Sequence, residues 1–248
     1  MCATAIAIAP AAHADHSHGG SSHTHETTIS ASAALLAAQY NTRAFIGDYQ
    51  GIVPAAHWST MRLAFSAMAP LYRITKNGAT YFGPGDVMAH GQVVLAGAHA
   101  QSAGLALAVS APTGSTRDGL GMGHVMVMPA AWASLPLGDA VIAASFGYGR
   151  AIGADGHAGH GSGPIVDPMN FSELTWSVTG DLALAPTLYA GVKFLGAFAT
   201  GDTGTDRMTG GARVTWVTGR VQTSAELQGG FVGDPFNVRG VVESLVRF

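Results

Sequence analysis

The sequence predicts an all-β protein, an antiparallel up-and-down transmembrane β-barrel of about twelve strands. Three observations predict this fold. Only 11% of the residues are charged, against roughly 25% in ordinary soluble domains. No run of about 18 or more apolar residues lacks a polar interruption, which argues against transmembrane helices. The apolar residues instead alternate with polar ones in short segments, and a closed barrel of such strands satisfies every backbone donor and acceptor within lipid.

The N-terminal residues predict export. Residues 1–14 read MCATAIAIAPAAHA, a short apolar run followed by Ala-His-Ala, which fits the cleavage pattern of a secretory signal. We expect a signal peptide over 1–14, cleaved after Ala14, then a flexible histidine-rich tail over 15–28 and the barrel over 29–248. The usual positively charged start is missing, which indicates a start further upstream or a truncated chain. The alternative is that Cys2 is a lipidated residue.

The alternation is clearest in the C-terminal third of the chain. Leu174, Trp176 and Val178 share one face of a strand, while Glu173 and Thr175 share the other. The same pattern predicts further strands, which we place at residues 29–40, 42–53, 60–71, 86–96, 103–111, 121–131, 140–150, 172–184, 188–198, around 213–216, 221–231 and 239–248. Short connections alternate with long ones, as in outer-membrane barrels, and an even strand count predicts that both termini lie in the periplasm.

The last strand also alternates. Its apolar side is formed by Gly240, Val242, Val246 and Phe248, and Glu243 and Arg247 lie on the other side. This strand resembles the C-terminal signal of bacterial outer-membrane proteins, which the barrel-assembly machinery recognises. The resemblance implies a location in the outer membrane of a Gram-negative bacterium, a lipid environment, and an assembly signal made of those four apolar-side residues.

Two glycine-rich turns carry a looser resemblance. Residues 83–86, Gly-Pro-Gly-Asp, open one predicted strand, and residues 111–114, Ala-Pro-Thr-Gly, close another. They are similar to turns in the outer-membrane transporters associated with meta-pathway phenol degradation. That resemblance implies the passage of small, including aromatic, compounds and transfers no catalytic residue.

The polar side of the strands predicts the barrel interior. We expect these lumen-facing residues: Arg62, His90, Gln92, Glu173, Asp181, Lys193, Arg213, Gln222, Glu226, Gln228, Glu243 and Arg247. Their charges are balanced, and two interpretations follow. The charges pair and fill a narrow barrel, or they line a narrow channel of small conductance and weak selectivity.

Histidines in the tail form a candidate metal site. His16, His18, His23 and His25 form His-x-His pairs, and an extended segment projects residues i and i+2 to the same side, so each pair could bind Zn²⁺, Cu²⁺ or Ni²⁺. The alternative is a solvated tail without an ion. A second cluster, on a long loop, contains Asp155, His157, His160 and Asp167.

Other function classes have weaker support. The formal net charge of −3 argues against a nucleic-acid partner. Ser110, His124 and Asp118 could form a hydrolytic set, but no Gly-x-Ser-x-Gly motif supports them, so we expect no enzyme. Met126 and Met128 share one face and are interpreted as packing residues rather than copper ligands.

The sequence therefore predicts a channel or uptake protein for small solutes. The alternatives are a closed barrel acting through its loops, or metal handling through the tail.

Overall fold

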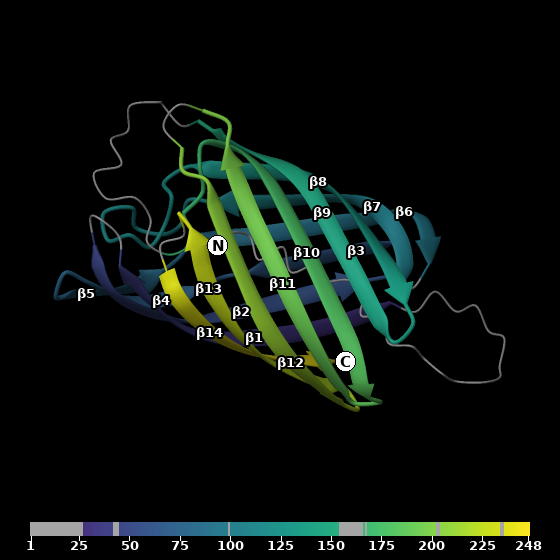
Figure 1. Cartoon of the computed structure of the whole chain (residues 1–248). Coiled ribbons are helices and arrows are strands. Elements are labelled where there is room, and N and C mark those ends of the chain that lie inside the picture. Colours follow the sequence, from purple (N-terminus) through teal and green to yellow (C-terminus); the bar gives the residue numbers. More distant parts are fainter. Residues whose placement is uncertain are drawn as a thin grey trace.

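The computed structural model describes residues 27–41, 45–98, 100–153, 166, 168–201, 204–233 and 236–248, and these form fourteen strands and no helix (Figure 1). No helix in this part of the chain has the length and apolar character needed to span a membrane. The strands are β1 (Thr28–Asn41), β2 (Ile46–Ser59), β3 (Leu63–Met68), β4 (Leu71–Lys76), β5 (Ala79–Pro84), β6 (Val87–Ala98), β7 (Gln101–Ala111), β8 (Val125–Leu137), β9 (Ala140–Ile152), β10 (Ser172–Ala185), β11 (Leu188–Ala199), β12 (Arg207–Thr218), β13 (Val221–Val232) and β14 (Phe236–Arg247).

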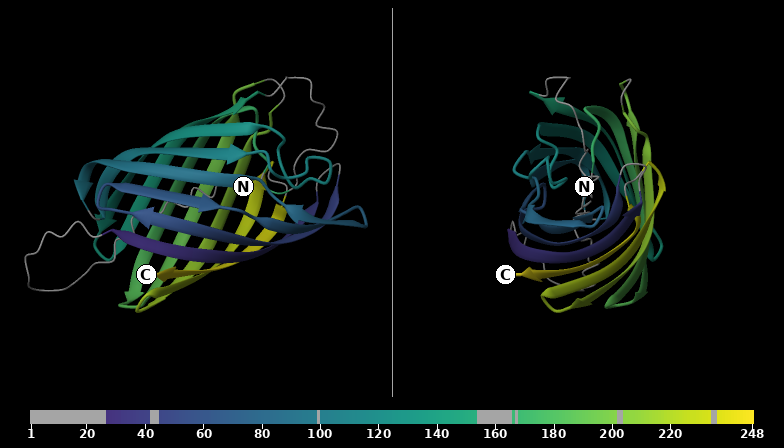
Figure 2. Two further views of the ribbon diagram at one scale, coloured as in Figure 1. Left: turned by 180° about the vertical axis from the view of Figure 1, so that it is seen from behind. Right: turned by 90° about the vertical axis from the view of Figure 1, so that its left-hand side faces the viewer.

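Twelve of the strands close into one antiparallel barrel. From β6 to β14 each strand pairs with the next, β14 pairs with β1, β1 with β2, β2 with β3, and β3 with β6. The view along the barrel in Figure 2 shows the strands surrounding an interior. The predicted fold class and strand number are confirmed.

The two remaining strands, β4 and β5, form a hairpin that extends the barrel at one point. The first half of β2 pairs with β4 and its second half with β3, so β3 and β4 continue one another across Ala69 and Pro70. The hairpin turns at Asn77 and Gly78, whose φ angles of 48° and 84° are both positive. An Asn-Gly pair is a strong type I′ turn signal.

The strand positions differ from the prediction in three places. The strand expected at 42–53 lies at Ile46–Ser59, and the one expected at 121–131 lies at Val125–Leu137. The strand expected at 60–71 is divided between β3 and β4, and the β4–β5 hairpin was not predicted. The predicted signal peptide and almost all of the predicted tail lie outside the described residues.

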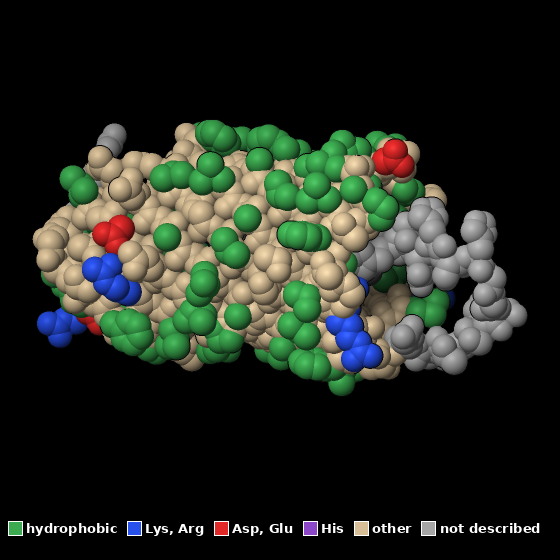
Figure 3. All heavy atoms as spheres, turned by 90° about the horizontal axis from the view of Figure 1, so that it is seen from below, with side chains coloured by type: hydrophobic (Ala, Val, Ile, Leu, Met, Phe, Trp, Pro, Cys, Tyr) green, Lys and Arg blue, Asp and Glu red, His purple; other side chains and the backbone are tan. Residues whose placement is uncertain are grey.

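The two faces of the strands differ in burial, as the alternation requires. On β1, for example, Ser32, Leu36 and Tyr40 are buried, while Ile29 and Leu35 are exposed. The exposed side carries Leu, Val, Ile and Phe, and Figure 3 shows one face of the molecule where charged side chains lie toward the two ends and hydrophobic ones between. This apolar belt is the surface that a bilayer covers.

Exposed aromatic side chains lie near both ends of this belt. Trp216 and Phe248 lie near the end that carries the chain termini, and Tyr148, Phe198 and Phe231 lie near the opposite end. Such aromatic girdles mark the two membrane interfaces of outer-membrane barrels. The outer wall therefore has the composition expected of a transmembrane barrel.

The two ends of the barrel differ in their connections. Strand β1 begins and β14 ends side by side, since the Phe248 amide donates to the Ile29 carbonyl at 2.9 Å. At this end the strands are joined by short turns at 60–62, 99–100, 138–139, 186–187 and 219–220. At the other end three of the connections are longer, at 112–124, 153–171 and 200–206. The termini thus share one end, and its assignment to the periplasm stays a prediction.

Candidate functional site in the barrel interior

One half of the inner wall, formed by β10 to β14, is charged. Arg213 on β12 contacts Asp181 on β10 through two hydrogen bonds, with its Nε donating to Asp181 Oδ1 at 2.9 Å. The residue between them on β11 is Gly191, which is paired with both. A Cβ atom at Gly191 would lie 2.2 Å from Asp181 Oδ1. The bidentate pair therefore depends on a strand position without a side chain.

A second chain of contacts crosses the same wall. Lys193 Nζ on β11 lies 3.2 Å from Glu226 Oε1 on β13, again across a glycine, Gly211 of β12. Gln228 donates from Nε2 to the same Glu226 oxygen at 2.5 Å, and Arg239 Nε donates to Gln228 Oε1 at 2.7 Å. This polar network thereby joins β11, β13 and β14. Together with the Arg213–Asp181 pair we call it the charged wall.

A buried ion pair lies nearer the long-loop end. Arg207 Nη2 lies 2.6 Å from Glu173 Oε2, and the two side chains are only 4% and 1% exposed. The same carboxylate oxygen accepts hydrogen bonds from the backbone N–H and the Nδ2 of Asn170, both at 2.9 Å. Buried charges are tolerated when they are paired and hydrogen-bonded in this way. This pair fixes the base of the long segment that precedes β10.

The other half of the inner wall, from β1 to β8, is mainly apolar, and we call it the apolar wall. Tyr49 packs against Tyr40 and Tyr72 with ring centroids 6.4 and 6.5 Å apart. The Tyr72 ring lies against glycines on two sides, since a Cβ at Gly51 or at Gly85 would be 2.4 Å from it. Fully buried Ile74 and a group of methionines complete this surface.

The two walls meet at Tyr49 and Arg239. Arg239 Nη1 donates to the Tyr49 hydroxyl at 3.5 Å, and its guanidinium lies 4.3 Å from the centroid of the Phe236 ring. Tyr49 is 0% and Arg239 3% exposed. Both residues pair with Ala38 of β1, so this contact joins the adjoining edges of the two walls over one small side chain.

Residues 112–124, the connection from β7 to β8, pack into the long-loop end of the apolar wall. The Asp86 carboxylate accepts hydrogen bonds from the backbone N–H of Gly114 at 2.9 Å and of Met122 at 2.7 Å. Leu120 and Met122 are buried in the same cluster as Tyr72 and Met126. Asp86 lies between β5 and β6, so the break between these strands holds the loop.

Toward the terminal end the inward side chains are polar, and those on β12 to β14 are more accessible. Thr215, Gln222, Ser224, Glu243 and Arg247 are half-buried. Hydroxyl pairs also join neighbouring inward positions, Ser145 with Ser177 at 2.7 Å and Ser102 with Ser134 at 3.1 Å. The inward side chains at the terminal end are therefore mainly polar.

Eleven of the twelve residues predicted to face the lumen lie on strands, on the side opposite the exposed apolar residues. They are His90, Gln92, Glu173, Asp181, Lys193, Arg213, Gln222, Glu226, Gln228, Glu243 and Arg247. Arg62 differs, since it is exposed in the turn before β3. The Thr60 hydroxyl accepts hydrogen bonds from the Arg62 and Leu63 amides at 3.3 and 3.1 Å. These bonds keep Arg62 in the turn, and the strand begins only at Leu63.

Sequence reasoning missed two charged residues of the interior, Arg207 and Arg239. The signal was present, because Arg207 has the parity of Arg213 on β12 and Arg239 that of Glu243 on β14. Both lie at the long-loop ends of their strands. The strand predicted around 213–216 was too short to include Arg207, and the strand predicted at 239–248 began at Arg239 itself.

The other candidate sites are not assembled as such. Ser110 Oγ is buried without a hydrogen-bond partner, and Asp118 accepts a hydrogen bond from Ser115 Oγ at 2.8 Å, so Ser110 and His124 do not form a nucleophile–base pair. His16, His18, His23 and His25 lie outside the described residues, as do Asp155, His157, His160 and Asp167. Within the described ranges, no group of three or more His, Cys, Asp or Glu side chains could hold a metal ion.

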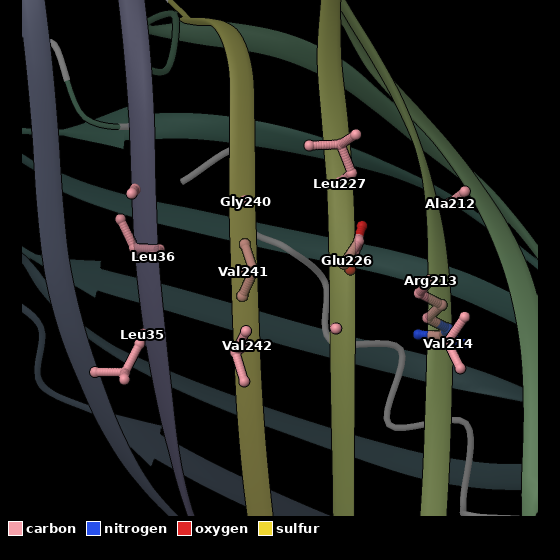
Figure 4. Close-up of a pocket in the computed structure, with 12 residues that line it drawn as sticks. Leu35, Leu36, Ala212, Arg213, Val214, Glu226, Leu227, Gly240, Val241 and Val242 are labelled. Carbon is pink, nitrogen blue, oxygen red and sulfur yellow. The ribbon is translucent and has the colours of Figure 1, made fainter.

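A groove of about 540 Å³ lies on the outer wall across β1, β12, β13 and β14 (Figure 4). Its rim carries the exposed side chains of Leu35, Leu227 and Val242, and its floor contains Ala225 and Gly240. The groove therefore belongs to the lipid-facing surface. Its floor includes Gly240 of the predicted assembly signal, and Val242, Val246 and Phe248 are exposed on the same face of β14.

No family model and no curated protein matches this sequence. Solved structures match its fold. An outer membrane channel from Pseudomonas putida F1 is similar with a TM-score of 0.67 and 12% identity, over 93% of this chain and 100% of that chain. The KdgM porin has a TM-score of 0.56 and 8% identity, over 88% and 99% of the two chains. The translocator domain of the autotransporter NalP from Neisseria meningitidis has a TM-score of 0.57 and 12% identity, over 94% and 90%.

At these identities the comparisons establish the fold. The chain is a twelve-stranded antiparallel barrel of the type found in bacterial outer-membrane proteins. The finer resemblance, to the transporters of meta-pathway phenol degradation, stays a prediction.

Proposed function

We propose that the chain is an outer-membrane channel for small solutes, narrow and weakly selective. The observation that carries this proposal is the charged wall, a polar network of inward side chains that crosses β10 to β14 and ends at Arg239 beside Tyr49. The fold is shared with proteins described as an outer membrane channel and a porin, which supports the same role.

Weak selectivity follows from the charges of the interior. The described inward positions carry the basic side chains Lys193, Arg207, Arg213, Arg239 and Arg247 and the acidic side chains Glu173, Asp181, Glu226 and Glu243. Charged rings in pores discriminate ions by sign, and here the signs nearly cancel. We therefore expect small conductance steps with a slight preference for anions.

Planar-bilayer recording of the purified chain tests the proposal. The Arg239→Gln variant removes one inward positive charge, so its selectivity should move toward cations. Arg220→Gln is the matched control, because Arg220 is exposed in a turn outside the interior. Absence of any conductance in both the natural chain and Arg239→Gln would instead favour the closed barrel that acts through its loops.

We extend the proposal to the class of solute. The apolar wall beside the charged wall suits small molecules with one apolar and one polar side, aromatic compounds among them. Liposome swelling with a small sugar and with a phenol of similar size compares the two classes. Faster swelling with the phenol supports aromatic solutes, and equal or slower swelling removes that part of the proposal.

Orientation, biogenesis and metal binding by the tail are further parts of the proposal. We propose that both termini are periplasmic and that Gly240, Val242, Val246 and Phe248 form the assembly signal. Deleting Phe248 should then reduce insertion into the outer membrane while in vitro refolding into detergent persists.

Calorimetry with Zn²⁺, Cu²⁺ or Ni²⁺ on a peptide spanning 15–28 tests metal binding by His16, His18, His23 and His25. Absence of heat would remove that site.

A further inference from the structure

Methionines from neighbouring strands lie in one row on the apolar wall. Met68 on β3 is directly opposite Met88 on β6, Met88 is opposite Ser110 on β7, and Ser110 is opposite Met126 on β8. Directly opposite residues of antiparallel strands have Cβ atoms about 4.5–5.5 Å apart. Met68, Met88 and Met126 are 6%, 5% and 0% exposed and belong to one cluster of contacting side chains.

The next row of the same wall contains two histidines and a fourth methionine. His57 on β2 is opposite Ser66 on β3, and Ser66 is opposite His90 on β6. His90 is opposite Ala108 on β7, and Ala108 is opposite Met128 on β8. The two rows are adjacent, since Met88 and His90 are two residues apart on the same face of β6. Thioether and imidazole groups are thereby gathered over the small side chains of Ser66 and Ala108.

The methionines on these strands occur only on the inward side. Their outward positions carry other apolar residues, such as Phe65 on β3, Val93 on β6 and Val127 on β8. Five of the chain's nine methionines are buried on this wall, at positions 68, 88, 122, 126 and 128. Packing alone is served better by Leu, which has fewer rotamers and specifies a core more firmly than Met. The segregation therefore points to a use of the sulfur atoms.

A buried histidine nitrogen supports the same conclusion. His57 is 8% exposed, and its Nε2 lies 3.0 Å from Ser32 Oγ. Its Nδ1 is buried and has no hydrogen-bond partner. When Nε2 donates its proton to the Ser32 hydroxyl, Nδ1 keeps a lone pair. A buried acceptor without a donor is costly in a folded protein, and a bound cation would satisfy it.

We infer that the apolar wall holds a binding site for a soft monovalent cation, Cu(I) or Ag(I), formed by the thioethers of Met68 and Met88 and the imidazoles of His57 and His90. Soft thioether ligands select Cu(I) over hard cations, and imidazole binds copper as well. The site does not depend on the proposed channel function, because binding requires no permeation.

Titration of the full chain in detergent with Ag⁺ tests the site. All proteins carry Cys2→Ser, so that every remaining sulfur is a thioether. The double variant Met68→Leu/Met88→Leu should weaken Ag⁺ binding at least tenfold, since leucine keeps nearly the same volume without the ligand atom. Met61→Leu is the matched control, because Met61 is 62% exposed in a turn outside the interior. It should bind as the parent does.

The His-rich tail is present in every variant, so its binding cancels in this comparison. Equal Ag⁺ affinity in the parent and the double variant would overturn the inference and leave the methionines as packing residues. If the double variant does not fold, X-ray absorption of the Ag⁺-loaded parent decides the matter. Sulfur neighbours around silver support the site, and nitrogen or oxygen neighbours alone reject it. Zn²⁺, a harder cation, should not compete for Ag⁺ at this site.

Discussion

The charged wall and the apolar wall of one interior are stabilised differently. On β10 to β14 the side chains are fixed by directional contacts, such as the bidentate Arg213–Asp181 pair. On β1 to β8 they are fixed by shape, as Tyr72 is by Gly51 and Gly85. A charged residue that loses its partner leaves an unsatisfied charge, whereas an apolar residue that is shortened leaves only a small cavity. The comparison teaches that single substitutions should cost more on the charged wall.

The largest effect is expected at the most buried ion pair. Arg207→Met leaves the Glu173 carboxylate buried without its cation, which should lower the free energy of unfolding by about 3–5 kcal/mol. Arg73→Met is the control, because the Arg73–Asp48 pair is 44% and 40% exposed and should change the value by less than about 1 kcal/mol. Urea unfolding in lipid vesicles measures both. Equal losses in the two variants would contradict the distinction between buried and exposed pairs.

A smaller effect is expected at Gly191, the glycine that lies between Arg213 and Asp181. Gly191→Ala places a methyl group 2.2 Å from Asp181 Oδ1, so either the Arg213–Asp181 pair or β11 must shift, at a cost of about 1–3 kcal/mol. The control is Gly180→Ala on the neighbouring strand, where the nearest atom is Val192 Cγ2 at 3.9 Å. The same unfolding assay applies. A neutral Gly191→Ala would show that the charged wall tolerates crowding.

The loop that covers the apolar wall should respond to loss of its anchor. Asp86→Asn keeps one acceptor oxygen for two backbone donors, so the loop should lose about 1.5 kcal/mol of local stability. Hydrogen exchange of the Gly114 and Met122 amides should then accelerate about tenfold. Asp118→Asn, whose carboxylate bonds only within the loop to Ser115, serves as the control. Unchanged exchange at Gly114 and Met122 would mean that packing of Leu120, not Asp86, holds the loop.

The smallest effect is expected inside the apolar wall. Ile74 is 0% exposed, and Ile74→Val removes one methylene group from a well-packed site, at a cost of about 1 kcal/mol. Urea unfolding provides the value, which should fall below those of Arg207→Met and Gly191→Ala. A larger loss than at Gly191 would reverse the order of the two walls.

The alternation of side chains was sufficient to predict the barrel and most of its strands. The misplaced strand at 121–131 has a non-local cause, because Gly121 and Met122 belong to the loop that is bound by Asp86, which lies between β5 and β6. Period-two patterning cannot distinguish a buried loop residue such as Met122 from a strand residue. The β4–β5 hairpin was within reach of sequence reasoning, since Asn77-Gly78 is a hairpin turn signal.

The sequence predicts which side chains face the interior but not which of them contact one another. The inward parity of Glu173, Asp181 and Lys193 follows from their own strands. Which cation each carboxylate binds depends on the register between strands, and a sequence pattern does not contain that register. For the same reason Met68 and Met88 give no sign of a shared site in isolation, and only the pairing of β2, β3 and β6 brings them beside His57 and His90.

Gly191 has a consequence for the assembly of the sheet. If β11 slid by two residues against its neighbours, Tyr189 or Lys193 would occupy the space that Arg213 and Asp181 now share. Such a slip keeps every apolar side chain facing outward, so the hydrophobic pattern alone does not oppose it. Glycine at position 191 therefore favours the native register of β11, because a larger side chain at this point of the sheet would displace the Arg213–Asp181 pair.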